Sequence, residues 1–78
     1  MKTGCASVAQ RIVNAENRFV DYAMETAGLT KEQAKHALFV MRHFRVVKID
    51  CITGQFAFIH GAYASEQSLV NAANIKVV

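Results

Sequence analysis

The chain has 78 residues, which is enough for one domain and excludes a multidomain enzyme. Apolar residues make up 53% of the sequence, which excludes intrinsic disorder, and no apolar run reaches the roughly 18 residues that a membrane-spanning helix needs. The formal net charge of +3 is too small to identify a partner by itself. We therefore expect one domain over 1–78 with a flexible tail at 1–6, a cytoplasmic location, and a core small enough to favour a homodimer.

The first predicted helix covers 8–27. Ser7 and Gln10 have the spacing of a capping box, and apolar residues then recur at the helical period on one face. Asn14 is a weak helix former, so a break there into two shorter helices is an alternative. Gly28 is a natural residue for the left-handed conformation that ends a helix.

A second helix is predicted over 31–44. Thr30 and Gln33 repeat the capping-box spacing, and the small and apolar residues that follow fall on one stripe. Phe39 lies on the opposite, polar side. An aromatic ring there predicts a cover, for which the chain's own elements are favoured over a partner protein.

Two short segments, 46–50 and 55–59, are rich in β-branched and aromatic residues and predict two strands. Gly54 supplies the positive φ that a short hairpin loop requires. Ser65 can cap a last short helix, after which 75–78 either frays or adds an edge strand.

Positive charge is concentrated in the second helix and the first strand. The cations there are Lys31, Lys35, Arg42, Arg45 and Lys48, against the single carboxylate of Glu32. Such a cluster suits a surface that faces phosphates, and it is equally typical of a solvated helix face.

The two cysteines, Cys5 and Cys51, form no recognisable metal or redox motif. A buried or idle thiol is therefore favoured for each over a disulfide or a metal ligand.

The order helix, tight turn, basic helix and hairpin is that of a winged helix-turn-helix. Residues 30–41, followed by 45–48, resemble the recognition helix and first wing strand of winged-helix regulators. This resemblance implies a small α+β fold with two or three N-terminal helices, a β-hairpin wing and a short C-terminal helix. Arg45 stands where that family commonly has Gly, so it either takes the left-handed conformation or extends the helix. The run 54–63 resembles small phage-encoded proteins, which suggests a phage origin.

The resemblance implies a regulator of transcription that places its second helix in the major groove of duplex DNA. On the helix, Lys31 would meet a phosphate, and Lys35 and His36 would reach bases or phosphates. The full set of candidate DNA-binding residues is Thr30, Lys31, Lys35, His36, Arg42, Lys48, Thr53 and Gln55.

A second hypothesis keeps the same scaffold without DNA. The chain would then be a small protein-binding module, or a phage-encoded inhibitor or adaptor of a host protein, with Phe39 in the interface. The sequence predicts no enzyme, no cofactor and no metal site, because its carboxylates are scattered and no nucleophile or phosphate-binding glycine loop is recognisable. The histidines His36, His43 and His60 also lack metal-ligand spacing.

Overall fold

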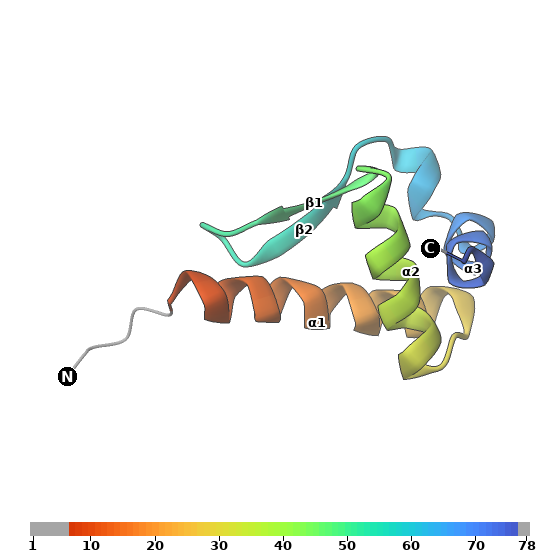
Figure 1. The fold of residues 1–78 in the computed structure, drawn as a ribbon, viewed down its shortest axis with the longest axis horizontal. Helices are drawn as coiled ribbons and strands as arrows, with labels where there is room; N and C mark the ends of the chain where they lie inside the picture. The colour runs from red at the N-terminus through yellow and green to blue at the C-terminus, as the bar shows by residue number, and fades with distance from the viewer. Residues whose placement is uncertain (1–6, 77–78) are drawn as a thin grey trace.

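The computed structural model describes residues 7–76, which form three α-helices, one 3₁₀ turn and one antiparallel hairpin (Figure 1). The elements are α1 (Val8–Ala27), α2 (Lys31–His43), β1 (Val47–Asp50), β2 (Gln55–Phe58), the 3₁₀ turn η1 (Gly61–Ala64) and α3 (Glu66–Asn74). The predicted α+β class is confirmed. The predictions for the tail at 1–6, for Cys5 and for residues 77–78 fall outside the described residues.

The helix α1 is continuous and capped at both ends. Ser7 Oγ accepts a hydrogen bond from the backbone N–H of Gln10 at 3.1 Å. At the other end Gly28 has a φ of 66°, and its N–H donates to the carbonyl oxygen of Met24 at 3.0 Å. The helix runs through Asn14 without a break, so the one-helix alternative is the correct one.

The helix α2 begins with the predicted capping box and ends in a Schellman motif, one residue earlier than expected. Beyond the last helical residue, His43, the N–H of Arg45 donates to Arg42 O at 3.0 Å, and the N–H of Val46 donates to Met41 O at 2.9 Å. Arg45 has a φ of 61°, so it takes the left-handed conformation rather than extending the helix. An arginine thus occupies a position where glycine carries no steric cost.

The hairpin turns one apolar face towards α1. Val47 pairs with Phe58 and Ile49 with Phe56, and because side chains alternate along a strand these four share a face. Each strand is one residue shorter at the open end of the hairpin than predicted, although a hydrogen bond of 2.9 Å from Ile59 N–H to the Val46 carbonyl continues the ladder.

The turn between the strands is held by one carboxylate and one glycine. Asp50 Oδ1 accepts hydrogen bonds from the backbone N–H groups of Ile52 at 2.8 Å and Thr53 at 3.2 Å. Gly54 has the predicted positive φ, 71°, and its N–H donates to the Asp50 carbonyl at 2.9 Å. A Cβ at Gly54 would lie 3.5 Å from the Arg11 carbonyl oxygen, so the turn rests directly on α1.

An aromatic cluster holds the hairpin on α1. The fully buried ring of Phe19 lies 5.3 Å from the ring of Phe56 and 5.9 Å from that of Phe58, measured between centroids. Tyr22 completes the cluster, and its hydroxyl donates to the Ala64 carbonyl at 2.6 Å. This bond ties α1 to the segment that leads into α3.

The three helices meet at one end of the molecule. The hairpin lies along α1, α2 crosses the C-terminal part of α1, and α3 packs against α2 (Figure 1). Ser65 caps α3 as predicted, accepting from the N–H of Ser68 at 3.3 Å, and Leu69 is fully buried beneath it. Ile75 and Lys76 add no strand. None of the helices in 7–76 is long and apolar enough to cross a membrane.

Candidate nucleic-acid interface

One side of α2 is open to solvent along its whole length. We call this side the basic face and define it by five exposed residues: Lys31, Lys35, Phe39, Arg42 and His43. At 100° per residue these positions fall within one sector of the helix, which also holds the exposed carboxylate of Glu32, while the buried residues of α2 lie on the other side. The interior of the protein therefore takes one half of α2 and leaves the cations on the other.

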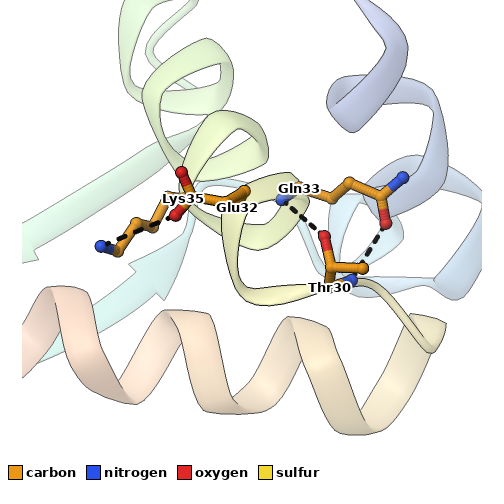
Figure 2. A network of polar contacts seen from close by, with 4 residues as sticks. All are labelled: Thr30, Glu32, Gln33 and Lys35. Carbon is orange, nitrogen blue, oxygen red and sulfur yellow. Dashed lines mark hydrogen bonds and ion pairs between the residues drawn. The ribbon is translucent and has the colours of Figure 1, made fainter.

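Two carboxylates contact the basic face. Lys35 Nζ lies 4.0 Å from Glu32 Oε2 (Figure 2), and the two side chains are 57% and 87% exposed. Arg42 donates to Glu16 Oε2 on α1 at 2.9 Å, with side chains 44% and 36% exposed. Exposed pairs of this kind contribute about 0–1 kcal/mol, so a phosphate can replace the carboxylate at little cost.

Phe39 is 56% exposed at the centre of the basic face. The expectation that another part of the chain covers it is therefore wrong. Its ring lies between two imidazoles of the same helix, 6.3 Å from His43 at 25° between planes and 6.5 Å from His36 at 32°. These neighbours flank the ring and leave its outer surface in water.

A groove of about 670 Å³ runs between α1 and α2 beside this ring. Buried Val20 of α1 and buried Leu38 of α2 contribute apolar surface to it, and Asn17 lines it from the side of α1. The rest of its lining comes from the basic face and Glu16. Its chemistry is apolar at the bottom and charged at the rim.

Two of the predicted site residues, Thr30 and His36, contact backbone groups of the protein through their side chains. Thr30 Oγ1 accepts from the N–H of Gln33 at 3.2 Å, and Gln33 Oε1 accepts from the N–H of Thr30 at 3.0 Å (Figure 2). His36 is half-buried, and its Nε2 contacts the carbonyl oxygen of Ile75, next to the end of α3. Thr30 therefore caps α2, and His36 connects α2 to the segment that follows α3.

The predicted hairpin residues lie apart from the basic face. Lys48 and Gln55 are exposed on the side of the hairpin that faces away from α1, and Thr53 is exposed in the turn. The hairpin extends away from α2, and its turn contacts α1 at Arg11 (Figure 1). Lys31, Lys35 and Arg42 thus lie together on α2, which crosses the C-terminal part of α1. The residues of the hairpin turn lie near the N-terminal part of α1.

The backbone donors in the turn also act on an acidic group. The N–H groups of Ile52 and then Thr53 hold the pKa of the Asp50 carboxyl below its ordinary value, because their hydrogen bonds favour the charged form. The neighbouring Cys51 is an exposed free thiol, so the buried alternative is wrong for it and the idle thiol stays a prediction. Within 7–76, no group of three or more His, Cys, Asp and Glu side chains could hold a metal ion.

The sequence did not indicate the contribution of α1 to this site. Glu16 and Asn17 line the groove, and Glu16 pairs with Arg42 from 26 positions away. No local pattern signals such a pair, because it depends on the angle at which the two helices cross.

Comparison of the chain with protein-family models, with curated proteins and with solved structures gives no match.

Proposed function

We propose that this protein binds duplex DNA by inserting the basic face of α2 into the major groove, on a winged-helix type of scaffold, and that it acts as a small regulator of transcription. The supporting observation is the exposure of the basic face, including Lys35 and Arg42, whose side chains are 57% and 44% exposed. A helix whose cations were covered by its own domain could not approach a polyanion.

The dimensions of α2 suit this role. Its 13 residues span about 20 Å, and a major groove about 12 Å wide admits a single α-helix. Lys31 at the N-terminal end would contact a phosphate, where the helix dipole adds to the attraction. Lys35 lies one turn further along and would reach a base edge or a phosphate. Arg42 would exchange its Glu16 partner for a phosphate of the same groove.

The other predicted residues would have supporting roles. Thr30 and His36 would keep α2 in place through the bonds described above. Lys48 follows closely on the end of α2 and would contact the DNA backbone as the base of a wing. Thr53 and Gln55 would meet only DNA that continues or bends along α1. In this proposal the role is binding without catalysis, in the cytoplasmic location expected from the sequence.

Salt dependence tests the proposal. With Lys31, Lys35 and Arg42 each neutralising one phosphate, log K should fall against log salt with a slope of about −2.7, or about 40-fold between 50 and 200 mM. Fluorescence anisotropy with a labelled duplex of mixed sequence measures this slope. Lys35→Glu should weaken binding and lower the slope, and Lys31→Glu with Lys35→Glu should abolish binding.

Arg18→Glu is the matched control. Arg18 is exposed on α1 and is not among the residues that line the groove, so reversing its charge changes the net charge equally without altering the basic face. Equal losses from Lys35→Glu and Arg18→Glu would mean that net charge alone attracts DNA. A flat salt dependence would contradict DNA binding altogether.

A second candidate function is protein binding, and the observation that favours it is the exposed ring of Phe39 over a groove with apolar surface. Under this alternative Phe39→Ala would weaken capture of a protein partner, by about 2 kcal/mol or more for an anchoring aromatic, while the fold stays intact.

The homodimer and the phage origin stay predictions. Sedimentation equilibrium can test the homodimer.

A further inference from the structure

Phe39 is an exposed aromatic side chain on a face whose other members are polar or charged. Among residues 7–76 it is the only large apolar side chain of the basic face, and it is 56% exposed. Lys35 lies one turn before it, and Arg42 and His43 one turn after it. A partner that buries this ring would meet Lys35 on one side of it and Arg42 on the other, which favours a partner with anionic groups beside an apolar centre.

Two imidazoles of α2 flank the ring. His36 and His43 flank it at 6.5 and 6.3 Å between centroids, both at shallow interplanar angles. His36 is itself anchored at the carbonyl oxygen of Ile75. The interior offers no alternative place, because the helix positions that face it are filled by the buried side chains of α2. The apolar surface of Phe39 is thus presented outwards.

Duplex DNA offers one apolar group where a helix in the major groove would meet it. The base edges there carry hydrogen-bond donors and acceptors, and the C5-methyl group of thymine is the exception. Phosphates line both sides of that groove and would meet the cations that flank Phe39. Resting on the DNA-binding function proposed above, we infer that Phe39 is a specificity-determining residue that reads the 5-methyl group of thymine in the major groove.

The experiment compares duplexes that differ only in that methyl group. Alternating d(AT)₁₀ and d(AU)₁₀ present the same donors and acceptors, and the second lacks every C5-methyl. The wild-type protein should bind d(AT)₁₀ more tightly than d(AU)₁₀. The expected ratio is about fourfold for each methyl group buried against the ring, which is the effect on affinity of burying one apolar carbon. Cytosine can carry a methyl group at the same ring position, C5. An alternating duplex of G and 5-methylcytosine should therefore bind more tightly than unmethylated d(GC)₁₀.

Two variants connect the effect to Phe39. Phe39→Ala should bind d(AT)₁₀ and d(AU)₁₀ equally, with the salt slope of the wild type, and circular dichroism should show an unchanged fold because the ring is exposed. Phe44→Ala is the matched control, since Phe44 is 58% exposed but follows the end of α2, and it should keep the preference for thymine.

The outcomes separate this inference from the proposed function. Equal binding of d(AT)₁₀ and d(AU)₁₀ by the wild type, with the salt dependence intact, would overturn the role of Phe39 and leave DNA binding standing. A thymine preference that survives Phe39→Ala, or tighter binding of single-stranded d(T)₂₀ than of d(AT)₁₀, would also overturn it. No salt-dependent binding to any of these duplexes would remove the proposed function itself.

Discussion

Replacing Arg45 tests whether the end of α2 is under backbone strain. Arg45 is the only non-glycine residue in 7–76 with a positive φ, and at 61° it occupies the C′ position of a Schellman motif. The perturbation is a pair of variants, Arg45→Gly and Arg45→Ala. Both remove the same charge from the helix end, so any loss of favourable interaction with the helix dipole is common to both.

The expected difference between the variants follows from the conformation. The left-handed region destabilises a residue with a Cβ by about 1–2 kcal/mol, which favours glycine. Glycine in turn loses more conformational entropy on folding than alanine does, which offsets about 0.5–1 kcal/mol of that advantage. Arg45→Gly should therefore be more stable than Arg45→Ala by about 0.5–1 kcal/mol. For a domain of this size that corresponds to a difference in Tm of about 2–8 °C.

Thermal and urea unfolding followed by circular dichroism at 222 nm measure both variants beside the wild type. Gly28→Ala is the mirror control, because Gly28 ends α1 at a φ of 66° and a Cβ there would meet no atom within 4 Å. It should lose stability from backbone strain alone, by a similar amount. Equal stability of Arg45→Gly and Arg45→Ala, with Gly28→Ala destabilised, would refute the claim that Arg45 is strained.

Two further predictions concern single hydrogen-bonding groups. Tyr22→Phe removes the 2.6 Å bond to the Ala64 carbonyl and should lower the free energy of unfolding by about 1 kcal/mol in urea denaturation; an unchanged value would mean that water replaces the hydroxyl without loss. The lowered pKa of Asp50 contributes stability that is present above the unfolded value of about 3.9 and is lost as the pH falls through the lower folded value. Asp50→Asn keeps an acceptor oxygen but cannot titrate, so its unfolding free energy should fall less steeply with acid below about pH 4 than that of the wild type, and parallel curves would contradict this.

The features that the sequence predicted correctly depend on residues close together in the chain. The caps at Ser7, Thr30 and Ser65 each involve a partner three positions away, and Gly28 and Gly54 act through their own backbone. Short-range hydrogen bonds and the preferences of glycine are sufficient to place these boundaries to within one residue.

The features that the sequence did not predict depend on how the elements pack. Helical periodicity placed Phe39 on the polar side of α2, but periodicity does not say which element lies next to that side. The crossing of α1 and α2 leaves the ring exposed and brings Glu16 to Arg42. Similarly, the residues of the hairpin predicted its strands but not its direction along α1, which separates Thr53 and Gln55 from the basic face.

The contact between the hairpin turn and Arg11 also bears on which parts of the molecule open together. The first turns of α1 lie away from α2 and α3, and the hairpin is the element that lies along them (Figure 1). If the hairpin lifts away, the first turns of α1 lose their apolar cover while the helical end of the domain remains packed. We therefore expect the hairpin and the first turns of α1 to open as one cooperative unit, so that amide hydrogens on either exchange with solvent together, ahead of those in α2.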